Sequence, residues 1–360
     1  MDPQFSQTTM TNGHPLITPE RIAELASGYA LSLIMEAAIR YNIFDILDDG
    51  PRTVQEVRDA NGASVRGLTA VMNALAGLGL MLKDHQGRFS LAPESSVFLV
   101  STKPEFQGGL LRRCSQYTLP RWLRLNEIVA TGKPADAINQ QLAGTAFFRE
   151  LVSDLFRRNY PAAKSLARHL LDGPMVVRNC HTVLDLGAGS GVWGIALAQN
   201  SPEIRITAVD WPEVLSITRE TAARFGVLDR FAFVDGDLLH IDFGSGYSVA
   251  TLGHILHSEG AQRSRALIAK TFDALLPGGT IAIAEFLVNA DRTGPLNALL
   301  FAVHMLVNTE RGDTYSFEEI SAWLSEAGFV DARMLEVPGP SPLILATKPQ
   351  SGIATEMGSE

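Results

Sequence analysis

The chain has 360 residues, of which 46% are hydrophobic, and its 30 basic and 39 acidic side chains give a formal net charge of −9. This length favours two domains, and the acidic balance argues against a surface for nucleic acid or for an anionic membrane. The two cysteines, Cys114 and Cys180, do not have the spacing of a metal site or of a disulfide framework. Because no basic-then-apolar leader and no bilayer-length apolar run occurs, we expect a soluble, cytoplasmic protein.

The N-terminal segment combines an irregular tail with a strongly apolar helix. Residues 1–17 lack hydrophobic periodicity, so we expect a disordered tail there, and likewise at residues 350–360. At Thr18-Pro19 a capping residue and a proline begin a helix that continues to about residue 40. This helix is apolar on nearly every side and therefore needs cover all round. We interpret it as part of the interface of a homodimer.

Residues 51–90 have the pattern of a winged helix. A short helix begins at Arg52, a second extends from Ser64 to Leu75, and a hairpin turns at Gln86-Gly87. DNA binding would need several basic residues on the second helix, which offers Arg66 alone. We therefore interpret residues 18–103 as a winged-helix dimerisation domain that does not bind nucleic acid.

Residues 104–172 are expected to be all-helical. One helical segment contains Trp122 and ends at Thr131-Gly-Lys-Pro134, and a second contains Phe148 among other aromatic residues. Aromatic residues at this spacing usually form core. In a chain that must cover a bound substrate, some of them form a lid. We therefore expect residues 104–172 to form a helical linker and substrate lid, with Trp122 and Phe148 in contact with the substrate.

From residue 181 onward strands and helices alternate, which indicates a largely parallel sheet in a domain of residues 173–349. We expect strands at about 183–186, 205–210, 231–237, 247–256, 280–285, 330–337 and 342–348, and helices at 212–225, 260–275, 296–308 and 316–327. The last two strands are separated only by Gly339-Pro-Ser-Pro342. This gap is too short for a parallel crossover, so they should form an antiparallel hairpin.

The first strand of this domain leads into a glycine-rich turn, Asp185-Leu-Gly-Ala-Gly-Ser-Gly191, and a helix follows. This arrangement lets backbone approach a nucleotide closely. Gly189 to Gly194 also match the G-x-G-x-x-G of dinucleotide sites, but Asp185 would repel a pyrophosphate and suits a cationic amino-acid tail. The second strand ends at Asp210, whose carboxylate can accept hydrogen bonds from ribose hydroxyls. The stretch resembles motif I of class I S-adenosylmethionine (SAM) methyltransferases.

Further markers extend this resemblance over residues 20–349. They are the winged helix, Trp122 before Thr-Gly-Lys-Pro, Asp210-Trp-Pro-Glu-Val, Gly236-Asp-Leu, Ile255-Leu-His257, Leu276-Pro-Gly-Gly and Ala327-Gly-Phe329. In this order they resemble the small-molecule O-methyltransferases, a family that includes the caffeate and hydroxyindole enzymes and bacterial natural-product tailoring enzymes. The resemblance implies an α/β Rossmann-like class I methyltransferase domain with an N-terminal dimerisation domain, SAM as cofactor and a small aromatic or polyketide-like substrate.

The resemblance also implies which residues hold the cofactor. The methionine end of SAM is expected at Asp185, Gly187, Gly189 and Gly191, the ribose at Asp210, the adenine face at Trp211, and the adenine edge at Asp237 and Leu238.

The same resemblance implies a catalytic set. The family's general base matches His257, its two flanking acids match Glu285 and Asp313, and its substrate-facing positions match His304 and Asn308. A hydroxyl is a poor nucleophile until it loses its proton, which a histidine near neutral pKa can take. A neighbouring carboxylate then orients the ring and stabilises the imidazolium.

The sequence departs from the family beside this histidine. The family's Trp-Ile-Leu-His-Asp-Trp is here His254-Ile-Leu-His257-Ser-Glu, Gly253 replaces a cofactor-binding lysine, and Thr314 replaces an arginine. The acceptor therefore stays open, with C- or N-methylation and a non-methylating hydroxylase, decarboxylase or pericyclase as alternatives. A SAM-sensing regulator is a more remote alternative.

A metal centre is an alternative interpretation of the same histidines and acids. His254, His257 and His304 with Glu285 or Asp313 have suitable ligand types. However, His254 and His257 are three residues apart and would face opposite sides of an extended strand. We therefore expect no metal ion.

Overall fold

The computed structural model describes residues 10–11, 14–15, 17–134, 146–171 and 181–350. Most of the two expected tails lies outside these residues, although Met10–Thr11 (β1) pairs with His14–Pro15 (β2). The chain divides into two compact units, residues 1–119 and 120–360. The segment 104–172, expected to be one linker, is thus shared between the two units.

The N-terminal unit has its own hydrophobic core, which includes Phe44, Met72, Leu75 and Phe89. Its further elements are α1 (Pro19–Ala26), α2 (Gly28–Arg40), α3 (Ile43–Asp48), α4 (Val54–Asn61), α5 (Val65–Gly77), β3 (Met81–Lys83), β4 (Phe89–Leu91), α6 (Pro93–Phe98), the 3₁₀-helix η1 (Gly108–Arg113) and the π-helix η2 (Cys114–Thr118). The antiparallel pairing of β3 and β4 after two helices confirms the expected helix–helix–hairpin pattern.

The expected single helix from Thr18 to residue 40 is wrong, because α1 and α2 form a pair bent by 40°. The bend lies at Ser27-Gly28, and Ser27 also donates its hydroxyl to the Ala23 carbonyl. Serine and glycine side by side are a common cause of sharp helix kinks. Among the described helices, none is by itself long and apolar enough to cross a membrane. The bent α1–α2 pair, taken as one segment, has the length and composition of such a helix.

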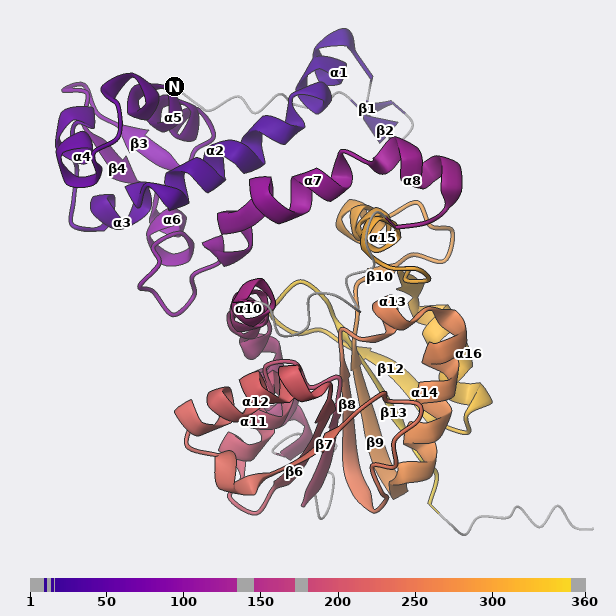
Figure 1. Ribbon diagram of the computed structural model, residues 1–360. Coiled ribbons are helices and arrows are strands. Elements are labelled where there is room, and N and C mark those ends of the chain that lie inside the picture. Colours follow the sequence, from indigo (N-terminus) through magenta and orange to yellow (C-terminus); the bar gives the residue numbers. More distant parts are fainter. Residues whose placement is uncertain (1–9, 12–13, 16, 135–145, 172–180, 351–360) are drawn as a thin grey trace, which may run out of the picture. The chain divides into compact units, whose positions relative to one another are not determined.

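The second unit is an α/β domain (Figure 1). Its elements are α7 (Leu119–Trp122), α8 (Leu125–Thr131), α10 (Ala146–Leu171), β5 (Thr182–Leu186), α11 (Val192–Asn200), β6 (Arg205–Asp210), α12 (Pro212–Arg224), η3 (Leu228–Arg230), β7 (Phe231–Asp235), β8 (Tyr247–Gly253), α13 (Leu256–Glu259), α14 (Ala261–Ala274), β9 (Leu275–Ala284), β10 (Leu287–Val288), α15 (Leu296–Asn308), β11 (Tyr315–Ser316), α16 (Phe317–Glu326), β12 (Val330–Leu335) and β13 (Leu343–Thr347).

Seven of these strands form the central sheet, in the order β12-β13-β9-β8-β5-β6-β7. The five strands from β5 to β9 are parallel to one another, β13 pairs antiparallel with β9, and β12 and β13 form the expected antiparallel hairpin. The expected strand 247–256 ends early, at Gly253, because His254 has a left-handed backbone with φ 61°. The strand expected from residue 280 begins earlier, at Leu275.

Both faces of the sheet are buried, so alternate residues of each strand enter different cores. Val183 packs in the core that includes α10 and α11, whereas the next residue, Leu184, packs in the core that includes α14 and α16. Helices accordingly cover both faces (Figure 1). The carboxyl ends of the parallel strands meet at one edge, which is where ligands bind in sheets of this kind.

Candidate active site

The glycine turn after β5 has the backbone expected of a close-approach site. Gly187, Gly189 and Gly191 have φ values of 64°, 57° and 75°, which residues with a side chain rarely adopt. A Cβ at Gly191 would lie 2.8 Å from the Thr218 side chain, whereas a Cβ at Gly189 would meet nothing nearer than 3.9 Å. The turn is therefore packed closely against the Thr218 side chain at Gly191 and has room beside it at Gly189.

Asp185 lies beneath this turn and is fully buried. One carboxylate oxygen accepts from Thr251 Oγ1 at 2.7 Å, and the other accepts from the Gly194 N–H at 3.1 Å. Burial raises the pKa of the carboxyl to about 7 against these two hydrogen bonds. The structure thus gives Asp185 a role in joining β5, β8 and the start of α11.

Asp210 ends β6 beside the same turn. Its carboxylate accepts from the Gly189 N–H at 2.9 Å and from the Trp211 N–H at 2.8 Å. Burial raises the pKa of Asp210 to about 6, and the negative charge of Glu259 adds to the effect. The Trp211 side chain is half-exposed, so its ring face is accessible at the strand end.

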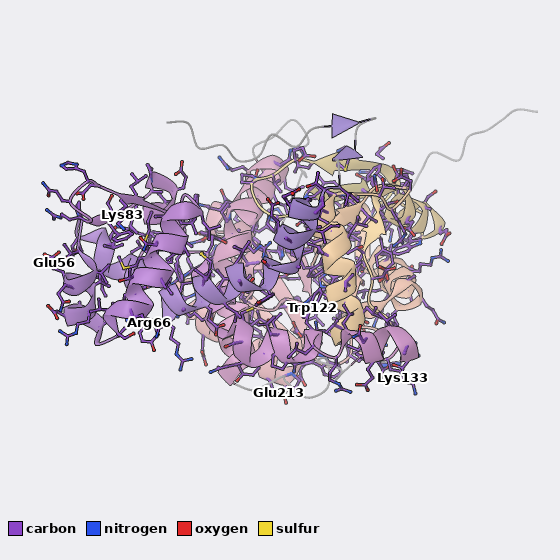
Figure 2. All side chains as sticks on the ribbon, turned by 90° about the horizontal axis from the view of Figure 1, so that it is seen from above. Glu56, Arg66, Lys83, Trp122, Lys133 and Glu213 are labelled. Carbon is purple, nitrogen blue, oxygen red and sulfur yellow. The ribbon has the colours of Figure 1, made fainter. Side chains whose placement is uncertain are left out.

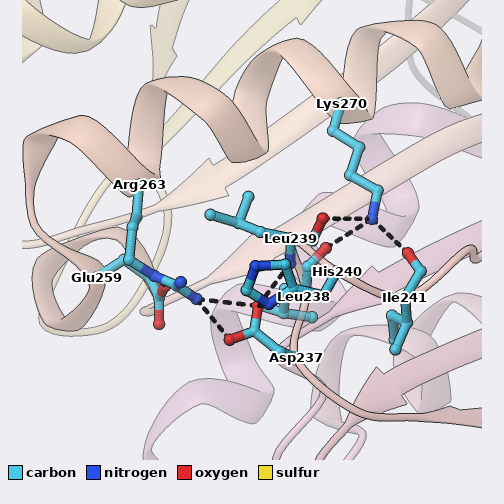
Figure 3. Close-up of polar contacts among 8 residues, drawn as sticks. All are labelled: Asp237, Leu238, Leu239, His240, Ile241, Glu259, Arg263 and Lys270. Carbon is cyan, nitrogen blue, oxygen red and sulfur yellow. Dashed lines mark hydrogen bonds and ion pairs between the residues drawn. The ribbon is translucent and has the colours of Figure 1, made fainter.

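Asp237 and Leu238 follow β7 in a loop that is tied to α14 (Figure 3). Arg263 donates to both Asp237 oxygens, at 3.0 and 3.1 Å, and also to Glu259. Lys270 donates to the backbone carbonyl groups of Leu238, Leu239 and Ile241. These cations hold the loop in place. The Asp237 carboxylate is ionised, since its pKa lies below its usual range despite partial burial.

Position 253 requires glycine for a steric reason that the sequence does not reveal. A Cβ there would lie 1.8 Å from Nε1 of Trp193, whose buried indole extends over it from α11. No larger residue, including the lysine of the family pattern, fits unless Trp193 moves.

His257, in α13 after β8, and Glu285, directly after β9, form a largely buried pair. The imidazole Nδ1 lies 2.7 Å from Glu285 Oε2, and the His257 N–H donates to Oε1 at 3.2 Å. The side chains are 12% and 2% exposed. Burial alone would raise the pKa of Glu285, but the His257 charge and hydrogen bonds, with a smaller contribution from His254, hold it below its usual range. Glu285 is therefore an ionised acceptor facing the ring.

Asp313 was expected as the second acid beside His257, and its carboxylate pairs with Arg292 in the structure. Its carboxylate accepts from Arg292 at 3.3 Å and from the Thr314 N–H at 2.8 Å, and it is half-exposed. The Asp313 N–H donates to the His257 carbonyl oxygen at 2.9 Å.

The expectation that His254 and His257 face opposite sides assumed that the strand extends through both residues, and this assumption is wrong. Since β8 ends at Gly253, the left-handed His254 turns the chain and the two rings come within 6.2 Å, centroid to centroid. Ligand atoms of His254, His257 and Glu285 all lie within 4.8 Å of one another, close enough that the three could hold a metal ion. A metal on His257 Nδ1 would, however, have to displace its 2.7 Å hydrogen bond to Glu285.

A row of aromatic rings lies beside the pair. His257 meets Phe301 edge-on at 4.9 Å, and Phe301 contacts Phe286 at 4.3 Å and His304 at 5.8 Å. His304 in turn stacks with Trp122, whose Nε1 lies 3.4 Å from His304 Nδ1, so Trp122 lies beside α15 (Figure 2).

His304 is a buried member of this row. Burial lowers its pKa to about 4, with contributions from the charges of His257 and Arg121, so the ring is neutral. The buried Asn308 donates its amide to the His304 carbonyl oxygen at 2.7 Å and contacts both ring nitrogens at 3.3 Å. The two expected substrate-facing residues therefore lie together. The side chain of Phe148 lies outside the described part of the chain.

Two matches to known families cover most of the chain. An O-methyltransferase domain matches residues 122–330, which is more than half of the chain, and an O-methyltransferase dimerisation domain matches residues 23–101. The chain belongs to the O-methyltransferase family. This O-methyltransferase uses SAM as its methyl donor.

Its relatives include two O-methyltransferases of Streptomyces species. The chain is 29% identical, over 89% of its length and 92% of the relative's, to the 3-hydroxy-5-methyl-1-naphthoate 3-O-methyltransferase of Streptomyces sahachiroi. It is 28% identical, over 92% and 97%, to the tetracenomycin 8-O-methyltransferase TcmO of Streptomyces glaucescens. The structure of human N-acetylserotonin methyltransferase has the same fold, with a TM-score of 0.81 at 23% identity over 95% of this chain and 100% of the human one.

Sequence reasoning missed three residues of this O-methyltransferase site: Phe286, Phe301 and Trp193. Phe301 could have been found, since it lies three residues before His304 and thus on the same face of α15. Phe286 directly follows Glu285. Trp193 gave no signal, because its contact with Gly253 joins positions sixty residues apart.

Proposed function

We propose that this O-methyltransferase methylates a hydroxyl group of a small aromatic or polyketide-like molecule, with His257 as general base. The observation that carries the proposal is the buried His257–Glu285 pair beside the row of Phe286, Phe301, His304 and Trp122. Flat aromatic side chains favour a flat aromatic ligand, because such rings attract one another in stacked and edge-on contacts. The aromatic substrates named for the two Streptomyces relatives support the same assignment.

The residues at the carboxyl edge of the sheet fit SAM. The turn would hold the methionine end at Gly189, where a Cβ would meet nothing nearer than 3.9 Å; Asp210 would hold the ribose, and Trp211 with the Asp237-Leu238 loop would hold the adenine. Asp185, whose oxygens are already engaged, supports this cofactor site by shaping the turn. The bound cofactor supplies an electrophilic methyl group on sulfur.

Residues of the chain orient the acceptor and remove its proton. Because Glu285 is an ionised acceptor at His257 Nδ1, that nitrogen carries the hydrogen and Nε2 is left free to accept the hydroxyl proton. The Glu285 charge stabilises the imidazolium that results. The Asp313 N–H anchors the backbone of His257. The aromatic row orients the acceptor and excludes water, which matters because the displacement requires alignment.

A mass-spectrometric screen with SAM tests the assignment. Phenols, carboxylic acids and amines of similar ring size are incubated with the enzyme, and products are sought at the mass of one added methyl group. We expect methyl transfer to phenolic hydroxyls, located by tandem fragmentation. Products methylated only on nitrogen or carbon would contradict the proposal.

We also propose that the protein is a homodimer assembled through its dimerisation domain. Ile22, Leu25 and Tyr29 are 57%, 64% and 66% exposed on α1 and α2, and contiguous apolar surface of this kind marks an interface. The double variant Ile22→Glu, Leu25→Glu should therefore shift the protein from dimer to monomer in sedimentation velocity at micromolar concentration. Val330→Glu, at a half-exposed site on β12, is the control and should stay dimeric. A monomeric wild type would disprove the homodimer.

A further inference from the structure

Arg158 on α10 is a half-buried cation beside the aromatic row, and the mechanism above does not use it. Its guanidinium carbon lies 5.8 Å from the centroid of the Phe286 ring. Among the described residues, no carboxylate forms an ion pair with it. Burial lowers the pKa of Arg158 with no acidic side chain counteracting the shift. Removing a charge from water without a partner is costly, so such a group calls for an anion.

The neighbours of Arg158 leave that charge available. Glu285 is engaged by His257 on both oxygens. His254, which lies 5.2 Å from Phe286, has its pKa lowered to about 4 by burial, with the His257 and Arg158 charges adding to the effect, and is therefore neutral. Its Nε2 lies 3.3 Å from Ser341 Oγ. Arg158 therefore lies beside Phe286 at one end of the uncharged aromatic row. The base, His257, contacts Phe301 in the same row.

We propose that Arg158 binds a carboxylate of the acceptor, so that the substrate is a hydroxylated aromatic acid whose acid group lies at Arg158 while its hydroxyl lies at His257. The planar guanidinium fork matches a carboxylate held in the plane of an aromatic ring, and Phe286 contacts both the cation and Phe301. This inference rests on the proposed hydroxyl methylation. The naphthoate acceptor named for the Streptomyces sahachiroi relative has the same chemistry.

The test compares a hydroxynaphthoic acid with its methyl ester and its carboxamide. For wild-type enzyme, the KM of the acid should be roughly 10- to 100-fold below that of the ester and the amide, the range of a charge-assisted contact. Arg158→Gln should remove this preference by raising the KM of the acid, while the KM of the ester changes less than about threefold and kcat for the ester stays near wild type. Arg158→Lys, which keeps the charge and loses the fork, should retain part of the preference.

Arg157→Gln, on the exposed neighbour in the same helix, is the matched control and should retain the full preference. Equal KM values for acid and ester in the wild type would overturn the inference without any variant, as would an equal loss of both substrates in Arg158→Gln. Methyl transfer to the carboxylate itself would also overturn it. Transfer to no hydroxyl in any of the three compounds would instead count against the proposed function.

Discussion

Replacing His257 by glutamine should lower kcat by roughly 10²- to 10⁴-fold, which is the usual contribution of a general base. Glutamine keeps a polar side chain of similar reach but cannot accept and carry a proton. SAM affinity should stay within a few-fold, because the contacts of His257 are to Glu285 and Phe301 and not to the glycine turn. Single-turnover rates together with calorimetric titration of SAM separate the two effects.

The neighbours of His257 should give graded losses. Glu285→Gln should reduce kcat less than His257→Gln, because Glu285 orients the ring and does not carry the proton. Asp313→Asn should change kcat little, since the Asp313 carboxylate faces Arg292 and its N–H to His257 belongs to the backbone. A chelator should change nothing if the His254–His257–Glu285 trio works without a metal ion.

Near-full turnover of His257→Gln on the true acceptor would contradict this account. The proton would then leave by another route, as it would from a strongly acidic hydroxyl. Loss of activity with a chelator, restored by added metal ion, would show that the trio binds a metal.

Replacing Asp210 by alanine should weaken both SAM and S-adenosylhomocysteine by roughly 10- to 100-fold, the expected loss of hydrogen bonds to a charged group. In the wild type, affinity for SAM should also fall as the pH falls through about 6, because Asp210, with a pKa of about 6, takes up a proton and loses acceptor strength. Calorimetry between pH 5.5 and 8 measures both effects. Asp210→Asn should lose this pH dependence, and NAD is the control ligand that should not bind. Tight NAD binding, or SAM affinity unchanged in Asp210→Ala, would contradict the cofactor assignment.

The same raised pKa values affect the stability of the protein without ligand. Folding raises the pKa of Asp185 to about 7 and that of Asp210 to about 6, above the values of an unfolded chain. Their contribution to the free energy of unfolding is therefore fully present below about pH 4 and is lost as the pH rises through 6 and 7. Cofactor that favours the ionised Asp210 should offset part of this loss.

The sequence by itself determined the order of the elements in the second unit and their faces. Hydrophobic runs separated by glycine turns predict buried parallel strands, and Gly339-Pro-Ser-Pro342 predicts the final hairpin; the pairing of β12 with β13 confirms it. These features depend on local chemistry, since strand period, helix caps and turn lengths are properties of neighbouring residues. The position of Asp210 at the end of the second strand followed from the same local signals, whereas His257 was identified through the resemblance to the family.

Only the tertiary structure decided which side chains meet. The left-handed backbone at His254 brings two histidines together that an extended strand would separate, and the Asp313 carboxylate pairs with Arg292. Arg158 and Phe286 come together from positions more than a hundred residues apart. Contacts of this kind depend on packing between distant elements and on competition among several possible partners. No local pattern in the sequence records the outcome of that competition.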